Sequence, residues 1–242
     1  MQGYLDDEPL RVARGLVRGA SIRNIFGFST LANTVYSPMW ERTPEEYEYP
    51  TANTFMNIKS DNASDGSNVS FLVKGLDSNY SEISESVNLN GTANVTLTKL
   101  YYRINDVIGT ANNALGTVTV RNANSGVTYA QVSQGVGKSQ ASIYTVPVGH
   151  CFYLNRIDAF CGTAAINNRY IFFRNYTKSP SGLVLNVAET TFLEQMHVNR
   201  HYPFKYDEKT DIQFQIKTSN GSQEVGVFGE GILVNESYTG GA

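Results

Sequence analysis

The segment Gly135–Ser139 has the sequence Gly-Val-Gly-Lys-Ser and therefore contains the end of a phosphate-binding loop. That motif also requires a glycine five residues before the Gly-Lys pair, and Val132 occupies this position. The segment lies between two expected strands, without a following helix whose N-terminal amides could bind phosphate. We expect a flexible glycine loop here and no nucleotide site.

The polar loop at residues 60–68, which follows an expected strand at residues 55–59, has part of the pattern of a calcium-binding loop. Asp61, Asp65 and Gly66 stand in the register of that motif. However, Ala63 occupies a position that needs an oxygen ligand, and Leu72 replaces the glutamate that closes the site. We therefore expect an ordinary turn rich in Asp and Asn, and no metal site.

The histidines and cysteines are too widely spaced to form a site locally. His197 and His201 would share a face of a strand at roughly 13 Å from each other, too far for one metal ion. Cys151 and Cys161 would be roughly 33 Å apart along a strand, beyond the reach of a disulfide, and could pair only if a tight turn fell between them. We expect the histidines at the surface or an interface, and the cysteines as buried, reduced thiols.

No combination of nucleophile, base and acid is present at a catalytic spacing. The Gly-x-Ser-x-Gly turn that exposes a nucleophilic serine is absent. Glu82 and Glu85 fall on opposite faces of one expected strand, so they do not form the carboxylate pair of a glycosidase. We therefore expect a protein that is not an enzyme, with no catalytic residue and no cofactor.

The composition limits the class of protein. The chain has 242 residues and a formal net charge of −3, and 15 Tyr and 12 Phe supply most of its aromatic content. Charged residues make up only 17% of the chain, a mixture typical of short strands joined by polar turns. Because Lys and Arg are not clustered, we expect no nucleic-acid partner. We expect no membrane span and no secretory signal, since no long apolar run is present.

Residues 1–50 differ from the rest because their apolar residues follow no sustained period. Glycines interrupt the segment, and each internal glycine destabilises a helix by about 1 kcal/mol. We expect an extended N-terminal arm that docks on its own sandwich or on a neighbouring subunit. The residues that we expect to anchor it are Arg14, Arg18, Ile25, Phe26, Phe28 and Trp40.

From Ala52 onward, apolar and polar residues alternate with a period of two, which is typical of half-buried strands. The clearest unit is residues 68–104, in which we expect three strands, a corner at Gly75–Asp77 and a tight hairpin at Asn90–Gly91. The apolar phase shifts near Lys99, which predicts a β-bulge there.

Later strands are expected at intervals of roughly 8–12 residues, with long links that favour a jelly roll over a simple meander. We therefore expect an all-β protein. Its parts are the arm at 1–50, an antiparallel, jelly-roll-like β-sandwich at 51–237 and a flexible tail at 238–242. The later strands are expected at residues 117–121, 127–132, 142–146, 152–160, 169–175, 183–188, 191–198, 212–218, 224–228 and 231–235.

Several stretches together carry a family resemblance: Val69–Glu85, Val87–Gly91, Tyr101–Ile104, Tyr144–Gly149 and Lys209–Ile212. Through them the chain resembles a family of tailed-bacteriophage virion structural proteins, over most of its length. The resemblance implies a non-enzymatic component of the virion that is assembled in the cytoplasm of a bacterial host. Because the matching stretches are turn and strand signatures, they imply fold and lineage more than a position on the particle.

Three functions remain open. The first is a capsid decoration or head-attached protein, anchored through the arm, with the major capsid protein as its partner and a homo-oligomeric state. The second is a ring or fibre-adaptor component of the neck or tail. The third is a carbohydrate-binding module for host-surface glycans, with platforms at Tyr101, Tyr102, Tyr170 and Tyr176.

Overall fold

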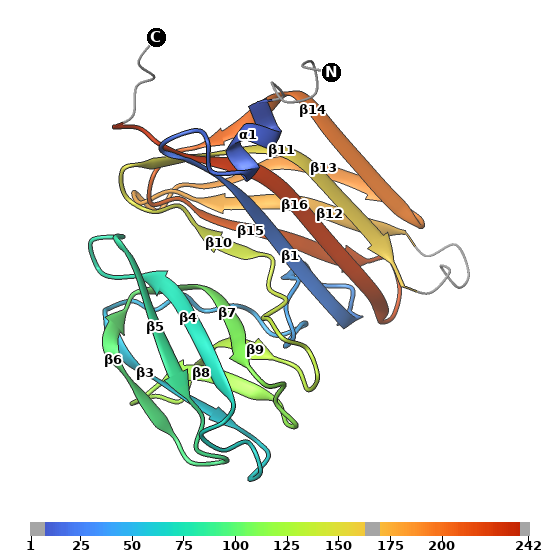
Figure 1. Ribbon diagram of the computed structural model, residues 1–242. Helices are drawn as coiled ribbons and strands as arrows, with labels where there is room; N and C mark the ends of the chain where they lie inside the picture. Colours follow the sequence, from blue (N-terminus) through green and yellow to red (C-terminus); the bar gives the residue numbers. More distant parts are fainter. Residues whose placement is uncertain (1–7, 163–169, 238–242) are drawn as a thin grey trace, which may run out of the picture.

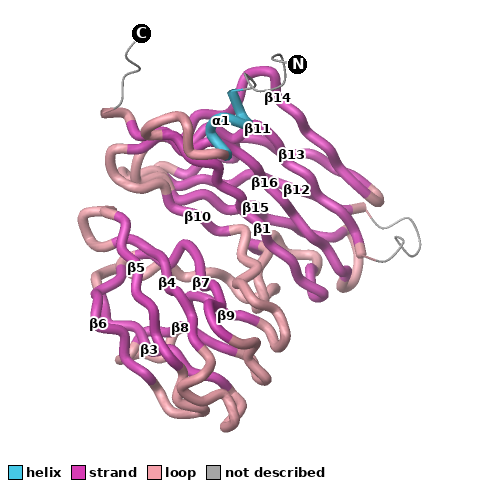
Figure 2. Tube along the Cα trace, viewed as in Figure 1, coloured by secondary structure: helices cyan, strands magenta, loops and turns pink. Residues whose placement is uncertain are grey.

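The computed structural model describes residues 8–162 and 170–237, which form one short helix, α1 (Glu8–Ala13), and sixteen strands (Figure 2). The strands group into two lobes, one above the other in Figure 1, and each lobe has its own hydrophobic core. No helix in the described part of the chain is long and apolar enough to cross a membrane. The predicted tail at 238–242 and Arg169 of one predicted strand lie outside the described residues.

The first lobe is a sandwich of two antiparallel sheets. One sheet has the order β1-β16-β11-β14, and the other has the order β10-β15-β12-β13, with β2 also paired to β15. We count β2 and β10 as one strand and number the strands of this lobe in chain order from 1 (β1) to 8 (β16). The first sheet then has the order 1-8-3-6, and the second sheet has the order 2-7-4-5. This is a jelly roll, so the predicted fold class is confirmed. The strands are β1 (Ala20–Ala32), β2 (Ser37–Pro38), β10 (Ile143–Thr145), β11 (His150–Cys161), β12 (Ile171–Lys178), β13 (Val184–Phe192), β14 (Gln195–Tyr206), β15 (Asp211–Thr218) and β16 (Gln223–Asn235).

One strand of the jelly roll is built from two distant pieces of chain. Along β15, β2 ends opposite Gln215 and β10 begins opposite Gln213. Between them, the backbone N–H of Ser142 donates to the carbonyl of Met39 at 2.7 Å. The chain therefore leaves and re-enters the same strand, and residues 40–141 form an insertion within it.

The insertion folds as a second, smaller sandwich. Its two sheets have the orders β6-β3-β8-β9 and β5-β4-β7. The expectation of a single sandwich over residues 51–237 is therefore corrected to two lobes. Alternation identifies a strand, but it does not say which sheet the strand joins. The strands are β3 (Thr54–Ser60), β4 (Ser70–Leu76), β5 (Glu82–Asn88), β6 (Val95–Tyr101), β7 (Arg103–Ala111), β8 (Val118–Asn122) and β9 (Thr128–Val132).

The corner that joins β4 to β5 is where the sequence predicts it. The Asp77 carboxylate accepts hydrogen bonds from the backbone N–H groups of Asn79 and Ser81 at 2.8 and 2.9 Å. This local pattern is the reason that Asp is favoured in turns. The predicted bulge near Lys99 is also confirmed, because the pairing of β6 with β3 shifts register in this stretch.

The predicted hairpin at Asn90–Gly91 is wrong. Gly91 has the expected positive φ of 58°, but β5 and β6 belong to different sheets, so the turn leads from one sheet to the other. The third predicted strand also divides, since β6 ends at Tyr101 and β7 begins at Arg103 in the opposite sheet.

The last two predicted strands are one continuous strand, β16. Its glycines suggest breaks in the sequence, but they make room for aromatic rings. A Cβ at Gly229 would lie 2.4 Å from the ring of Phe214, and one at Gly231 would lie 2.6 Å from the ring of Phe152. These rings fill the jelly-roll core, so the glycines contribute to packing.

The expected arm at residues 1–50 is largely part of the folded body. β1 pairs with β16 over its length, and Ile25 is 3% exposed in the jelly-roll core. Trp40 is 2% exposed in the core of the inserted lobe. The apolar residues of this segment follow no single period because they belong to two different cores. The described residues before β1, 8–19, form an N-terminal extension that carries α1, and Val12 of this helix is buried.

Candidate functional site

The glycine-rich segment at 135–139 closes an edge of the inserted lobe. The backbone N–H of Gly109 donates to the carbonyl of Gly137 at 2.7 Å, and the backbone N–H of Ser139 donates to the carbonyl of Val107 at 2.9 Å. The Lys138 ammonium lies 3.1 Å from the carboxylate of Asp106. The segment therefore extends the β7 sheet edge, and its lysine is engaged in an ion pair.

The calcium-like loop is organised by a buried carboxylate. Asp65 accepts hydrogen bonds from the Ser60 hydroxyl and from the backbone N–H groups of Leu115 and Gly116. Burial raises the pKa of Asp65, but these hydrogen bonds outweigh it, so the pKa is lowered overall. Asp65 thus ties the loop to the start of β8. In the described part of the chain, no three His, Cys, Asp or Glu side chains gather closely enough to hold a metal ion.

The other reactive residue types also have structural partners. His197 Nδ1 lies 2.9 Å from the carboxylate of Asp158, and His201 stacks edge-on against Tyr202. Cys151 and Cys161 are free thiols near opposite ends of β11, as predicted, although Cys161 is only partly buried. Burial, and then a hydrogen bond to a carboxylate, raises the pKa of Cys151 to about 11, so its thiolate is disfavoured.

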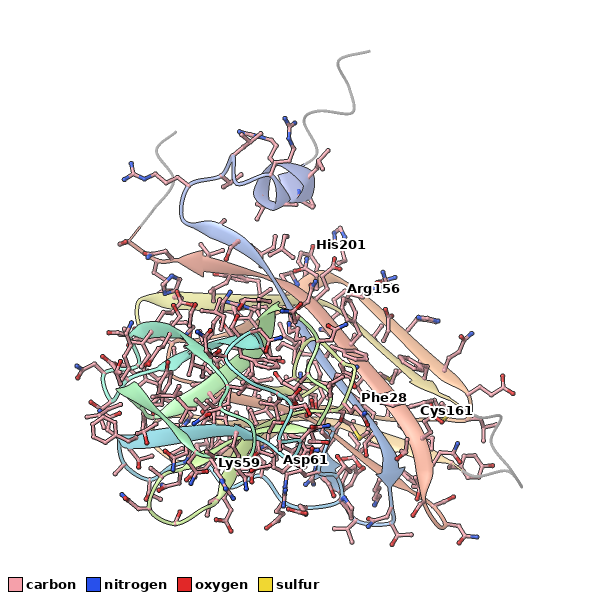
Figure 3. The ribbon with its side chains drawn as sticks, turned by 60° about the horizontal axis from the view of Figure 1, so that its bottom comes forward. Phe28, Lys59, Asp61, Arg156, Cys161 and His201 are labelled. Carbon is pink, nitrogen blue, oxygen red and sulfur yellow. The ribbon has the colours of Figure 1, made fainter. Side chains whose placement is uncertain are left out.

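The structure separates the six predicted anchor residues. Arg14 and Arg18 are exposed between α1 and β1, and Phe26 and Phe28 are half-buried on β1. Figure 3 labels Phe28 on this strand, and it also labels Arg156 and His201 on the jelly roll and Lys59 and Asp61 in the inserted lobe. Ile25 and Trp40 are core residues, so they are unavailable as anchors.

A buried ion pair joins the two lobes. Arg103, at the start of β7, places Nε 2.9 Å from Oδ1 and Nη2 3.0 Å from Oδ2 of Asp211, at the start of β15. Asp211 also accepts a hydrogen bond from the Thr145 hydroxyl at 2.6 Å. The Nη1 group of Arg103 donates to the carbonyls of Pro50 and Tyr102. Both charged groups are thus hydrogen-bonded several times, which a buried ion pair needs to be stable.

Tyrosine rings enclose the same arginine. The guanidinium carbon of Arg103 lies 4.2 Å from the ring centroid of Tyr102, 4.7 Å from that of Tyr49 and 5.7 Å from that of Tyr80. Burial alone would lower the pKa of Arg103, but the hydrogen bonds and charge of Asp211 raise it above its ordinary value. The junction between the lobes is therefore a charged and fixed contact.

The side of the jelly roll away from the insertion is open. β13 and β14 are the last strands of their sheets, opposite β10 and β1. No described strand pairs with their outer edges. About half of each of Leu183, Val184 and Leu185 is exposed at the start of β13, and Tyr202 of β14 is 78% exposed. β13 contains no lysine or proline, which natural edge strands use to block further pairing, whereas β14 contains Pro203 and Lys205 near its end. This side therefore offers unpaired backbone and apolar side chains to another chain.

Sequence reasoning missed these open edges, although a signal was present. The run Leu183–Leu185 contains three consecutive apolar residues, whereas a half-buried strand buries alternate ones. At least one residue of such a run must face solvent or another molecule. The strand was predicted, but its place at a sheet edge depends on pairing between distant segments.

No protein-family model matches the chain, and no curated protein matches it. Solved structures that resemble it include the VP2 subviral particle of infectious bursal disease virus, with 12% identity over 90% of this chain and 72% of that chain and a TM-score of 0.25. The Gt strain of the same virus gives 9% identity over 92% and 74% of the two chains and a TM-score of 0.21. At these TM-scores the likeness carries no argument about function.

Proposed function

We propose that the protein is a structural component of a virus particle. The observation that carries the proposal is a jelly roll with two open, partly apolar strand edges on the side away from its insertion. Jelly rolls occur in viral capsid domains, but also in lectins and cupins. The fold by itself therefore supports a capsid role only by analogy. The open edges favour the capsid interpretation, because they suit sheets that continue into a neighbouring subunit.

In the proposed particle, neighbouring copies meet along β13 and β14. Strand addition at β13 would satisfy its unpaired N–H and C=O groups and would bury the exposed side chains of Leu183, Val184 and Leu185. Because the insertion joins the jelly roll at the opposite edge, the second lobe would stay clear of these contacts.

The family resemblance supports a more specific proposal, in which the particle is a bacteriophage and the protein decorates or attaches to its head. The N-terminal extension with Arg14 and Arg18 would then contact the underlying capsid protein. A ring or fibre-adaptor position in the neck or tail is the alternative, and it would use the same open edges.

A charge placed on the open edge tests the proposal. We expect the wild-type chain to form a closed homo-oligomer in sedimentation velocity and Leu185→Lys to sediment as a monomer with an unchanged circular dichroism spectrum. Leu100→Lys, on β6 of the inserted lobe, is the matched control because Leu100 is also a partly exposed leucine on a strand; this variant should still assemble. Equal assembly of Leu185→Lys and wild type would contradict the proposed interface.

A further inference from the structure

A groove lies between the two lobes, on the outer face of the sheet that contains β12 and β15. Its volume is about 470 Å³, within the roughly 300–1,000 Å³ of small-molecule sites. One wall carries Arg174, Tyr176 and Lys178 of β12, and the other is the chain segment at 46–51 that leads into the inserted lobe. Both lobes are therefore needed to form it.

The floor of the groove is a line of fixed polar groups. Gln213 and Gln215 are only 5% and 7% exposed. The Nε2 group of Gln215 donates to Oε1 of Gln213 at 2.5 Å, and the Nε2 group of Gln213 donates to the Tyr49 hydroxyl at 3.2 Å. Within the described residues, each of these amides uses one of its two hydrogens. The remaining hydrogens are oriented donors for a ligand, since burying them unpaired is costly.

One wall presents an arginine held between aromatic rings. Arg174 Nε donates to Oε1 of Gln215 at 2.7 Å. Its guanidinium carbon lies 4.1 Å from the ring centroid of Tyr36 and 5.6 Å from that of Tyr176. Within the described part of the chain, the Nη groups of Arg174 make no hydrogen bond, so they remain available to a ligand. The planar guanidinium donates well to paired oxygen acceptors.

The charges that line the groove are balanced. Arg174 and Lys178 face Glu46 and Glu48, so the lining offers both donors and strong acceptors. A polyanion would be repelled by the glutamates, and an apolar ligand would leave the polar floor without hydrogen bonds. A neutral ligand with many hydroxyl groups satisfies both kinds of group, and its C–H faces can pack on the tyrosine rings.

We propose that this groove binds a short neutral oligosaccharide. Sugar hydroxyls would accept from Gln213, Gln215 and Arg174 and donate to Glu46 and Glu48, and a sugar ring would pack against Tyr176. The proposal adds a binding site to the assembly role and does not depend on it.

The structure also shows which of the four tyrosines that the sequence suggested as sugar platforms line the groove. Tyr101 is buried in the core of the inserted lobe, and Tyr102 packs against Arg103 and Tyr80. Tyr170 is exposed but does not line the groove. Of these four residues, Tyr176 alone lies in the groove.

Saturation-transfer NMR on the full chain tests the site. The probes are maltotriose, cellotriose and mannotriose, with trigalacturonate as an anionic comparison. We expect transfer to at least one neutral trisaccharide. Thr51→Trp should weaken that binding at least tenfold, because Thr51 is an exposed rim residue and an indole there would fill the groove. Tyr176→Ala should have a similar effect, whereas Tyr170→Ala should bind like wild type.

The outcomes separate the site from the fold. Unchanged circular dichroism of Thr51→Trp would show that its loss of binding comes from the groove. Absence of transfer to all three neutral trisaccharides would overturn the proposal. It would also be overturned by equal binding to Thr51→Trp and wild type, or by tighter binding of trigalacturonate. None of these results concerns oligomerisation, so the sugar-binding proposal and the assembly proposal are tested independently.

Discussion

Arg103 shows how one side chain can define the relation between two lobes. The sequence places it in Tyr101–Ile104, one of the stretches that carry the family resemblance, but it does not reveal its partner, because Asp211 lies 108 positions further along the chain. Only the folded chain brings the start of β7 against the start of β15. The tyrosines around Arg103 also come from separate places in the chain: Tyr102 is its direct neighbour, whereas Tyr49 and Tyr80 precede it by many residues.

Removing this arginine should destabilise the protein strongly. Arg103→Ala leaves the Asp211 carboxylate buried without its counter-charge, which typically costs about 3–5 kcal/mol. We expect a loss of this size in the free energy of unfolding measured with urea. Arg42→Ala is the control, because it breaks an ion pair with Glu45 that is more exposed and should cost less than about 1 kcal/mol. Equal losses in both variants would mean that the buried pair does not hold the lobes.

Glu41 should make stability depend on pH. It lies where the chain enters the insertion. One carboxylate oxygen accepts a hydrogen bond from the backbone N–H of Gln140, and the other is buried without a hydrogen-bond partner among the described residues. Burial raises the pKa of Glu41 to about 7 from 4.5. The folded state therefore binds this proton more tightly than the unfolded state. The resulting stabilisation is full below pH ~4.5 and is lost as the pH rises through about 7.

Replacing Glu41 with glutamine removes its contribution to the pH dependence of the free energy of unfolding. In urea denaturation, Glu41→Gln should gain stability relative to wild type between pH 5 and pH 8, by at most about 3 kcal/mol. Glu46→Gln, at an exposed position, should follow the wild-type pH profile. A difference between Glu41→Gln and wild type that stays constant with pH would contradict the assignment.

At the scale of elements, the sequence predicts strands better than it predicts sheets. Alternating apolar residues located most strands after residue 51, whereas β1 and β2 lie in the segment that was expected to be an extended arm. Asp77 and the phase shift near Lys99 predicted a corner and a bulge. Sheet membership was missed because it depends on pairing between distant segments, as when β2 and β10 complete one strand on β15. The groove was missed for the same reason, although Tyr176 was selected from the sequence as a platform.

The glycines of β16 illustrate a signal that the sequence presents ambiguously. Gly229→Ala would place a methyl group against the Phe214 ring, and such overpacking typically costs about 1–3 kcal/mol. We expect a loss of this size in thermal or urea unfolding. Gly137→Ala is the control, because a Cβ there would have no atom within 4 Å other than those of Gly137 and its two chain neighbours. A neutral Gly229→Ala would mean that the core is looser than the structure indicates.

At the scale of the molecule, the second lobe is an insertion, and we expect the jelly roll to fold without it. The carbonyl of Met39 and the N–H of Ser142 are hydrogen-bonded, so a short glycine linker can replace residues 40–141. With Asp211→Asn to remove the unpaired charge, we expect a β-rich protein that unfolds cooperatively in calorimetry. A product without a cooperative transition would mean that the jelly roll needs the insertion in order to fold.

Electron cryo-microscopy of the assembled wild-type chain tests the central claim most directly. The account predicts a closed, symmetric assembly in which β13 and β14 lie at the contacts between subunits and the inserted lobe stays outside them. A chain that remains monomeric at every concentration used for imaging, or subunits that meet through the inserted lobe while β13 stays in solvent, would contradict it.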